Sequence, residues 1–446
     1  MPAPLAGRVV LDSATARLES FKRIWLMFAP VPEEWLHKKG GKDQPAAKPL
    51  LSCLPCESYA SLINAWRKAM QWTEGLDYAL SAMLASVTST RSVGSQLWLK
   101  VMGPASCGKT TLCEAINVAD KYVISKSTIR GFHSGWQREG GENASLIDLV
   151  RDKTLVTKDG DTLLQSPNLG QILAEARDIY DSTSRSHFKN GAGQDHTGVR
   201  MTWLLCGTSS LHAIDSSELG ERFLNCYIME GIDDDLEDEI LWRVANRADR
   251  NMAIESNGSP DTQYDPDMVA AMRLTGGYVN YLRENASALL GAITIPDPSK
   301  RKITRLGKFV AYMRAKPSKI QTEHDEREFA ARLVEQHVRL AKCLAAVMNR
   351  STVDEQVMER VQRVSMDTCR GKTLKIVERL YVEDDGLEPK SLAMFIGEAD
   401  DKVKTLLRFL RRIGVVDIVE VQTGRGTARR FALTDLIRRV YTEVMA

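Results

Sequence analysis

The chain has 446 residues, of which 26% are charged and 43% hydrophobic, and its formal net charge is +2 at pH 7. That length allows about two to four domains with cores of their own, and the composition is ordinary for a soluble globular protein. The N-terminal segment has no apolar core of signal-peptide length, and no window approaches about 18 consecutive apolar residues. A cytoplasmic protein without a membrane partner is therefore expected.

Eight cysteines are scattered along the chain. Cys53 and Cys56 form a lone CxxC pair, and no second Cys pair or Cys/His cluster follows at the spacing of zinc ligands. Thiols without a special role are the ordinary case in a cytosolic protein. Neither a disulfide nor a metal is assigned to them.

Residues 1–90 predict helices without a chemical signature. Apolar residues at helical spacing occur near residues 18–28 and again over residues 57–88. Between them, residues 37–49 are polar with glycines and prolines, which is typical of an exposed loop. We expect a helical N-terminal region here.

The stretch LWLKVMGPASCGKTTLCEA, residues 97–115, holds the most informative motif of the chain. Gly103, four residues and then Gly108-Lys109-Thr110 reproduce the P-loop spacing GxxxxGK[ST], between an apolar run and a helix-compatible segment. In that context backbone N–H groups cradle phosphate oxygens, Lys109 reaches the β- and γ-phosphates, and the Thr110 hydroxyl binds Mg²⁺. The predicted cofactors are therefore ATP and Mg²⁺. The residues expected to bind the nucleotide are Gly103, Pro104, Ala105, Ser106, Cys107, Gly108, Lys109, Thr110 and Thr111.

An acidic motif follows the P-loop motif by about fifty residues, which is the distance expected of a Walker B strand. The apolar run 154–157 leads into Lys158-Asp159-Gly160-Asp161, and Asp159 is predicted to hold the Mg²⁺ shell. No Asp-Glu pair follows this strand, so the base that activates water stays open among Asp161, Glu175 and Asp178. A surface turn built on Asp-Gly-Asp is the alternative interpretation.

Two further polar positions follow in the same half of the chain. Residues 171–180 predict a helix, a polar segment follows, and the apolar run 199–207 predicts a strand that ends at Thr208. Arg222 comes later, in GERFL, where it is either a surface charge or a catalytic arginine.

The order of these elements resembles AAA+ ATPases. The segments KDGDTLL, ARDIYDSTSRSHFKNG and GERFL are similar to a group of ATPases from bacteriophages and mobile elements that are related to the minichromosome maintenance (MCM) helicases. The resemblance covers about residues 95–365. It implies that Thr208 is the sensor-1 residue, which orients the attacking water, and that Arg222 is an arginine finger that reaches the γ-phosphate of a neighbouring subunit.

Residues 327–363 are similar to the MCM lid helices. The match implies that Arg332 is the sensor-2 arginine, with Glu335 and Arg339 following in pattern. Amphipathic helices with solvated charges explain the same pattern, because Leu333 and Leu340 lie on one stripe, and both interpretations can hold together. Residues 255–266 and 294–305, between core and lid, predict exposed connections.

The C-terminal stretch resembles a winged-helix domain. Helices are predicted over residues 374–382 and 390–396, and a third runs from an N-cap at Asp400 to residue 413; a hairpin of residues 415–421 and 430–433 follows. Basic side chains lie on the third helix, including Lys404 and Arg408, and at the turn of the wing, including Arg425. They predict contacts with duplex DNA, whereas packing against a protein partner is the alternative.

These observations predict an α/β fold with an AAA+ P-loop core, in which a parallel sheet is flanked by helices. The predicted boundaries are 1–90 for the helical N-terminal region, 91–260 for the core, 261–368 for the helical lid and 369–446 for the winged helix.

The expected function is that of a DNA-dependent ATPase that forms a hexameric ring, because Arg222 can serve catalysis only in a neighbouring subunit, with single-stranded DNA in the pore. Lys189, before sensor 1, is the expected phosphate contact there. A replicative helicase or initiator of a phage or mobile element is the first hypothesis. The second is an ATP-switched assembly factor, such as a helicase loader or a transposition regulator, without unwinding activity. A small-molecule P-loop kinase would instead be a compact monomer.

Overall fold

The computed structural model describes residues 51–126, 128–133, 145–187, 193–215, 222–228, 234–252, 264–316, 329–423 and 426–445. Lys189 and Arg425, two of the predicted DNA contacts, lie outside the described residues, as does the predicted helical segment near residues 18–28. The described residues belong to one compact unit, Leu50–Ala446.

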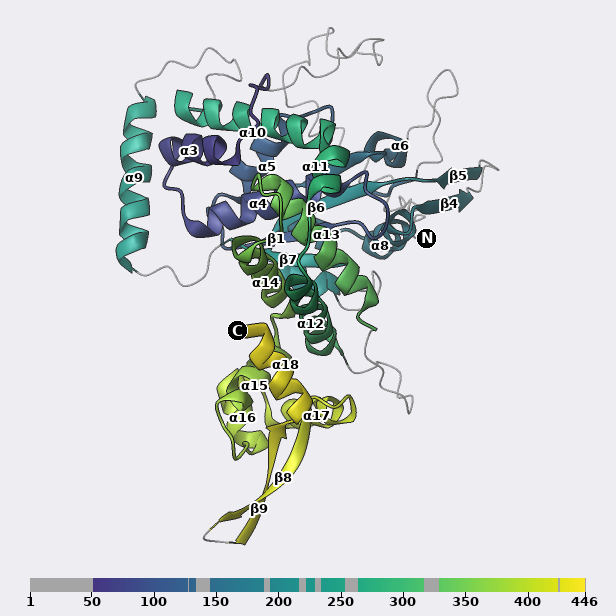
Figure 1. The fold of residues 1–446 in the computed structure, drawn as a ribbon, viewed down its shortest axis with the longest axis vertical. Helices are drawn as coiled ribbons and strands as arrows, with labels where there is room; N and C mark the ends of the chain where they lie inside the picture. The colour runs from purple at the N-terminus through teal and green to yellow at the C-terminus, as the bar shows by residue number, and fades with distance from the viewer. Residues whose placement is uncertain are drawn as a thin grey trace, which may run out of the picture. The chain divides into compact units, whose positions relative to one another are not determined.

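A five-stranded parallel sheet lies at the centre of this unit (Figure 1). In spatial order its strands are β2 (Val123–Ser125), β3 (Lys153–Thr157), β6 (Met201–Gly207), β1 (Trp98–Met102) and β7 (Phe223–Tyr227). Strands β1 and β6 are buried along their whole length, which is why they are mostly apolar in the sequence; Lys100 and Thr202, the polar exceptions, are buried as well. The α/β class with a parallel sheet is thereby confirmed.

Because the strands are parallel, the two edges at which they begin and end are chemically different. At the carboxyl edge, Met102 of β1 pairs with Gly207 of β6. At the opposite edge, which we call the amino edge, Trp98 pairs with Phe223 of β7. Loops that follow β1, β3 and β6 therefore meet at the carboxyl edge.

Alternate side chains of the strands enter two separate apolar clusters, one on each face of the sheet. On one face Trp98, Leu155 and Trp203 pack with α6 (Leu146–Val150) and α8 (Leu169–Tyr180). On the other face Leu99 and Leu204 pack with a larger group of helices. That group contains α3 (Tyr59–Ala69), α4 (Glu74–Ser89), α5 (Lys109–Asn117), α10 (Pro266–Glu284), α13 (Ala331–Val347) and α14 (Glu355–Cys369).

Helices from the predicted N-terminal region and from the predicted lid share one core. Trp66 of α3 is fully buried and its indole N–H donates to the Thr275 hydroxyl of α10 at 3.1 Å. Helix α4 packs along α13. Residues 51–90 are therefore built into the same apolar cluster as residues 264–369, on the larger helical face of the sheet.

The prediction of an exposed connection at residues 294–305 is wrong. The short helix α11 (Ala286–Ala292) is followed by α12 (Asp297–Arg314), which is a regular helix. Its first turn is polar and carries a proline, so the local sequence resembles that of a loop. Further along the helix, Ile303, Leu306 and Phe309 are fully buried against neighbouring helices. Burial of its apolar face against other helices therefore explains why this segment is helical.

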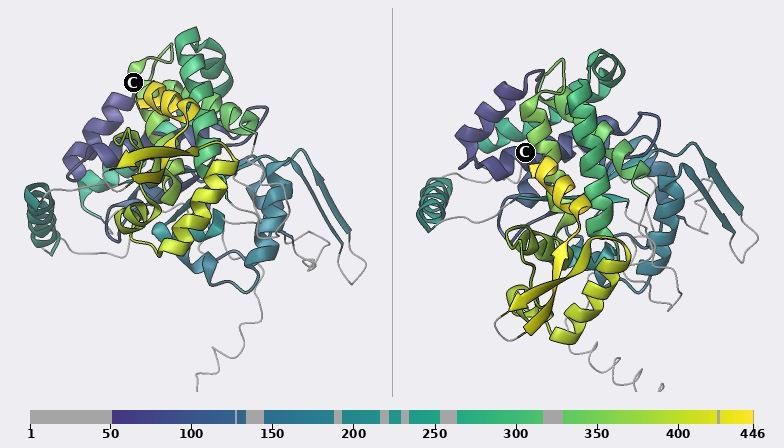
Figure 2. Two further views of the ribbon diagram at one scale, coloured as in Figure 1. Left: turned by 90° about the horizontal axis from the view of Figure 1, so that it is seen from below. Right: turned by 60° about the horizontal axis from the view of Figure 1, so that its bottom comes forward.

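A hairpin that the sequence did not predict follows α8. Strand β4 (Thr183–His187) pairs antiparallel with β5 (Gly193–Thr197), from Thr183 opposite Thr197 to His187 opposite Gly193. The hairpin projects from the body of the unit in every ribbon view (Figures 1 and 2).

The C-terminal residues have the helices and hairpin that the sequence predicts. The elements are α15 (Lys372–Tyr381), α16 (Pro389–Ile396), α17 (Asp400–Arg412), β8 (Val416–Thr423), β9 (Gly426–Leu433) and α18 (Asp435–Met445). The N-cap prediction at Asp400 is wrong, because Asp400 is the first helical residue and Ala399, in an extended conformation, is the cap. Sequence reasoning also missed α18.

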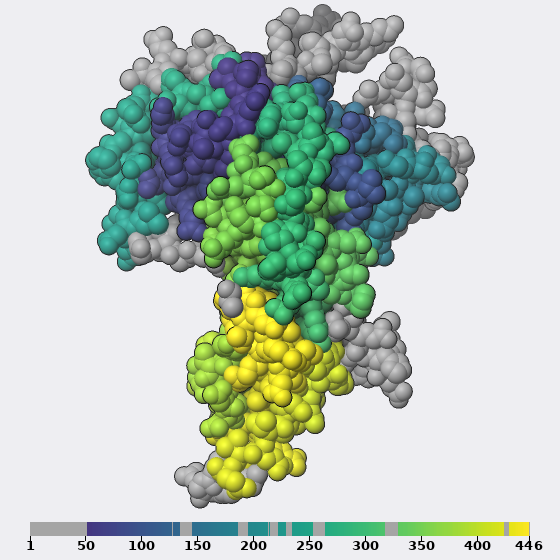
Figure 3. All heavy atoms as spheres, in the orientation of Figure 1, coloured from purple at the N-terminus to yellow at the C-terminus, as the bar shows by residue number. Residues whose placement is uncertain are grey.

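Helix α18 joins this segment to the rest of the unit. The ring of Tyr441 lies 5.6 Å from that of Phe309 on α12, and Glu443 pairs with Arg305 at 2.8 Å. The space-filling view shows the C-terminal residues, in yellow, directly against the helical residues coloured green (Figure 3). Among the residues that the structure describes, no helix combines the length and apolar character needed to cross a bilayer.

Candidate functional site

The loop between β1 and α5 has the backbone shape that phosphate binding requires. Gly103 N–H donates to the carbonyl of Gly207 at 3.3 Å, which fixes the start of the loop beside the end of β6. Ser106 (φ 64°) and Gly108 (φ 92°) are in the left-handed region, a backbone conformation that also occurs in anion-binding nests. A Cβ on Gly108 would meet Leu76 at 3.0 Å as well as straining the backbone, so glycine is needed there.

Two positive groups lie at this loop. Helix α5 begins at Lys109 without a side-chain cap, which leaves its N-terminal dipole and N–H groups available to an anion. The Lys109 amine donates to the carbonyls of Gly103, at 2.7 Å, and Pro104, so it lies across the loop itself. A bound phosphate would compete with these carbonyls for the same amine.

Thr208 and Asp161 meet at the carboxyl edge, although 47 residues separate them. The Asp161 carboxylate accepts hydrogen bonds from the Thr208 N–H at 2.9 Å, from the Thr208 hydroxyl at 3.2 Å and from the Ser210 hydroxyl. Gly160 N–H donates to the carbonyl of Cys206 at 2.6 Å, which ties the turn after β3 to β6. Because β6 lies between β3 and β1, this group is next to the phosphate loop.

The other two candidates for the base lie elsewhere. Glu175 accepts hydrogen bonds from the N–H groups of Phe132 and His133 and from Gln171, which ties α8 to the loop after β2. Asp178 is exposed near the end of α8, whose last residue, Tyr180, packs against Trp98 at the amino edge. Only Asp161 of the three shares a hydrogen-bonded group with Thr208.

Thr110 and Asp159 both have the chemistry of Mg²⁺ ligands. Thr110 is exposed on the first turn of α5, and Asp159 is exposed directly after Lys158, at the end of β3. Mg²⁺ is held in such sites by one or two carboxylates, a hydroxyl, waters and the phosphates of the nucleotide, so this pair fits the ion. No group of three or more His, Cys, Asp or Glu side chains in the described part of the chain forms a metal site by itself.

Sequence reasoning missed the apolar wall of this site. A cavity of about 230 Å³ contains residues 106–111 and is closed by Met70 and Leu76 from the α3–α4 region, Met268 from α10, and Ile240 and Val244 from α9 (Asp234–Met252). No described side chain of α9 is fully buried, and the helix lies at the side of the body in both ribbon figures (Figures 1 and 2). The amphipathic pattern of residues 234–252 is the sequence feature from which α9 could have been predicted.

Arg222 and Arg332 converge at the amino edge. Arg222 is only 6% exposed, pairs with Asp181 at 2.8 Å and lies over the ring of Tyr180. Gln336, one turn after Arg332 on α13, donates to the Tyr180 hydroxyl and to the Arg222 carbonyl, each at 2.9 Å. Burial raises the pKa of Tyr180, while the Gln336 hydrogen bond and the charges of Arg332 and Arg222 act in the opposite direction.

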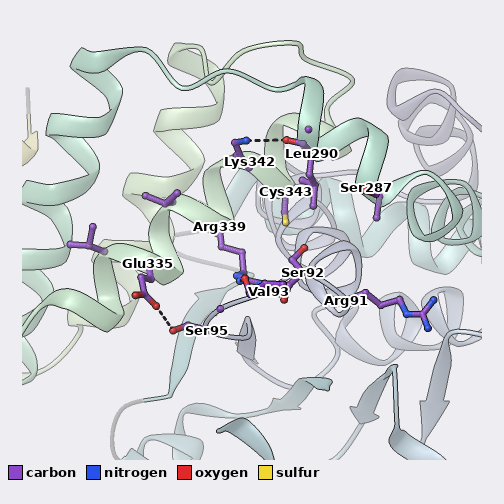
Figure 4. Close-up of a pocket in the computed structure, with 15 residues that line it drawn as sticks. Arg91, Ser92, Val93, Ser95, Ser287, Leu290, Glu335, Arg339, Lys342 and Cys343 are labelled. Carbon is purple, nitrogen blue, oxygen red and sulfur yellow. Dashed lines mark hydrogen bonds between the residues drawn. The ribbon is translucent and has the colours of Figure 1, made fainter. Parts of the chain in front are cut away.

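The next turns of α13 connect the lid to the loop before β1. Glu335 accepts a hydrogen bond from the Ser95 hydroxyl at 2.7 Å, and Arg339 donates to the carbonyls of Ser92, at 2.9 Å, and Val93. These residues line a cavity of about 710 Å³ between α11 and α13 (Figure 4). Because Ser95 precedes β1, the cavity is at the amino edge and has no part in the P-loop site.

The predicted DNA contacts that the structure describes lie on α17. Lys404 pairs with Asp400 at 2.6 Å, and this hydrogen bond raises the pKa of its amine. Arg408 is exposed. Both side chains are on the surface, as a duplex contact requires.

Neither the models of protein families nor the curated proteins that were searched contain a match to this chain. The case for a function therefore rests on the two groups of residues at the two edges of the sheet.

Proposed function

We propose that this protein is a DNA-dependent AAA+ ATPase that forms a ring, and that it acts as a replicative helicase or initiator of a phage or mobile element. Mg²⁺-ATP binds at the phosphate loop of one subunit, and the arginines of its neighbour complete the site. In this proposal the protein works on DNA in the cytoplasm, with single strands in the pore and duplex at the winged helix.

The separation of the two groups of residues by the sheet carries the proposal. The phosphate loop, Thr208 and Asp161 are at the carboxyl edge, whereas Arg222 and Arg332 are at the amino edge. Strands β1 and β7 run five residues between the two edges, so about 13 Å of strand separates the groups. Arginines that assist hydrolysis must touch the γ-phosphate, so the half-buried Arg332 would serve the loop of another copy. Arg222, which is 6% exposed and paired with Asp181, would have to leave that pair to do the same.

Within one subunit, each group has its own chemistry. Lys109 and the N-terminus of α5 stabilise the charge on the phosphates, and the Thr208–Asp161 pair is placed to orient the attacking water. Thr110 and Asp159 would hold Mg²⁺, which would supply positive charge that stabilises the phosphates.

Mixing two inactive variants tests whether the site is shared. Lys109→Ala removes the phosphate contact, and Arg332→Ala removes an arginine that is only half-buried and therefore replaceable without loss of the core. Each variant alone is expected to lose most of its ATPase activity. A mixture regains activity, because the intact loop of one variant meets the intact arginine of the other.

The expected rate of an equimolar mixture is well above the sum of the two separate rates, at the same total protein concentration. A mixture of Lys109→Ala with a second variant of the same loop, Thr110→Ala, is the control, since it contains no intact loop. If the ATPase rate of each mixture equals only the sum of the rates of its two separate variants, a shared site is contradicted. An ATPase that is unchanged by both Lys109→Ala and added DNA would contradict the whole proposal.

One observation favours the slower alternative, an ATP-switched assembly factor without unwinding activity. The Asp161 carboxylate is already engaged by Thr208 and Ser210, and no glutamate follows Asp159 as a ready base. Strand displacement on a forked DNA separates the two functions. A helicase releases the labelled strand as ATP is consumed, whereas a switch hydrolyses ATP and releases none.

A further inference from the structure

Helix α9 turns one of its faces toward the phosphate loop. Ile240, Val244 and Arg247 line the cavity of about 230 Å³ that contains residues 106–111. These three residues are four and three positions apart in the chain, so they lie on one side of the helix. The face that α9 presents to the loop is therefore apolar at two positions and basic at the third.

The charged groups in this cavity are all positive. Lys109 and Arg247 are among the described residues of its lining, and none of those residues is an Asp or a Glu. Helix α5 begins at Lys109 without a side-chain cap, so its N-terminal dipole acts in the same direction. Positive charge gathered in a concave surface concentrates anions.

Arg247 has no partner of its own in the described part of the chain, where no residue forms a hydrogen bond or an ion pair with it. A carboxylate that pairs with an arginine on the same helix is three or four residues away. The four positions at that spacing from Arg247 hold no carboxylate, and two of them are also arginines, Arg243 and Arg250. Like charges at this spacing destabilise a helix, and an anion bound at Arg247 would relieve that repulsion.

The size of the cavity and the loop inside it indicate which anion it receives. A cavity of about 230 Å³ is smaller than most ligand pockets, which measure about 300–1,000 Å³, so it fits a part of a nucleotide. Gly108, Lys109 and Thr110 in its wall belong to the motif whose spacing predicts phosphate binding. A guanidinium group matches a phosphate in shape, because two of its N–H groups can donate to two phosphate oxygens.

We propose that Arg247 binds the phosphates of the nucleotide that the phosphate loop of its own subunit holds, so that α9 forms one wall of the nucleotide site. The proposal rests on the ATP-binding part of the proposed function. It gives the loop a second cation from the same subunit besides Lys109, whereas Arg222 lies at the opposite edge of the sheet.

Binding of Mg²⁺-ATP to the full chain, measured by isothermal titration calorimetry, tests the proposal. Arg247 is half-buried, and no described side chain of α9 is fully buried, so Arg247→Ala should fold normally. This variant should bind ATP about tenfold more weakly, because it loses one hydrogen-bonded contact between charged groups. Arg247→Lys should recover part of the affinity. Arg250→Ala, an exposed change on the same helix outside the loop cavity, is the matched control and should leave the Kd unchanged.

A titration with inorganic tripolyphosphate shows which part of the nucleotide Arg247 contacts. Tripolyphosphate has the phosphates of ATP without the base and the ribose, so Arg247→Ala should weaken its binding by a similar factor. If the variant binds ATP more weakly but tripolyphosphate as tightly as the wild type does, Arg247 contacts the base or the ribose, and the proposal is overturned.

A mixture of variants shows whose loop Arg247 serves. In an equimolar mixture of Lys109→Ala and Arg247→Ala, every intact loop belongs to a subunit that lacks Arg247. A contact within one subunit leaves these loops with the weak affinity of Arg247→Ala, whereas a return to the wild-type affinity would assign Arg247 to a neighbouring loop and overturn the proposal.

The failure of this inference and the failure of the proposed function give different results. A Kd for ATP that is unchanged in Arg247→Ala, but lost in Lys109→Ala, overturns the role of Arg247 alone. A wild-type protein that binds no ATP overturns the proposed function as well.

Discussion

His337 is a titratable residue in the middle of the helical core. It is fully buried on α13, between Leu333 and Leu340, and its Nδ1 donates to the Leu333 carbonyl at 2.5 Å. Its Nε2 is buried without a hydrogen-bond partner among the described atoms. Burial lowers the pKa of His337 to about 4, because the charged ring would lose its hydration and a second N–H would have no acceptor.

The low pKa of His337 predicts acid sensitivity. The pKa of His337 is about 6.5 in the unfolded chain and about 4 in the folded one, so between these pH values the unfolded chain binds more protons. The contribution of His337 to the free energy of unfolding is therefore complete above pH 6.5 and is lost as the pH falls. From pH 7 to pH 5 this residue should lower the free energy of unfolding by about 2 kcal/mol. Urea unfolding at both pH values measures this loss of stability. Between pH 7 and pH 5 the His337→Leu variant should lose less stability than the wild type, and the difference should equal the contribution of His337. An equal loss in variant and wild type would show that other groups cause it.

At the scale of elements, close backbone approaches fix how the helices pack. The segment before α3 lies against α10 so closely that a Cβ on Gly277 would be 1.7 Å from the Leu54 carbonyl oxygen. Leu54 N–H also donates to the Arg273 carbonyl at 3.0 Å. A glycine inside a helix is unfavourable by itself, so the close approach of the two backbones explains why residue 277 is a glycine.

The two glycines Gly277 and Gly291 make a matched test of this packing. Gly277→Ala should destabilise the protein by about 2 kcal/mol or more, because the backbone of residue 54 must move. Gly291→Ala, on α11, has nothing within 4 Å of the new Cβ and should stabilise it by about 0.5 kcal/mol through helix propensity. Thermal unfolding of both variants measures the difference. Similar midpoints would mean that the segment before α3 is not packed on α10 in solution.

At the scale of the whole molecule, ligand binding to the phosphate loop should stabilise the entire unit. The loop joins β1 to α5 and contacts Leu76 of α4, so it is part of the continuous core rather than an appendage. Anything that binds only the folded state raises the free energy of unfolding by RT ln(1 + [L]/Kd).

Mg²⁺-ATP at about one hundred times its Kd should therefore raise the free energy of unfolding by about 2.7 kcal/mol. The midpoint of thermal unfolding should rise with ATP concentration in the wild type, and Lys109→Ala should show almost no rise. Removal of Mg²⁺ by a chelator should reduce the shift if Thr110 and Asp159 hold the ion. A shift that survives Lys109→Ala would place the nucleotide elsewhere.

The sequence by itself determined the local elements and the phosphate loop. Glycines at positions 103 and 108, Lys109 and Thr110 specify the turn because few residues adopt φ above zero or leave room for phosphate. Mostly apolar runs at residues 97–102 and 199–207 predicted buried strands, and periodic apolar residues predicted most helices, because these patterns reflect the geometry of single elements. The winged-helix elements were predicted for the same reason, apart from α18.

Only the tertiary structure decided which distant residues meet. It joined Asp161, and neither Glu175 nor Asp178, to Thr208, and it brought Arg222 and the turn of α13 that holds Gln336 together at Tyr180 on the opposite edge. It also made α12 a buried helix and placed Arg247 of α9 in the lining of the phosphate-loop cavity. Such contacts depend on the order of strands in the sheet and on helix packing, which arise from interactions across tens to hundreds of residues and leave no local pattern in the sequence.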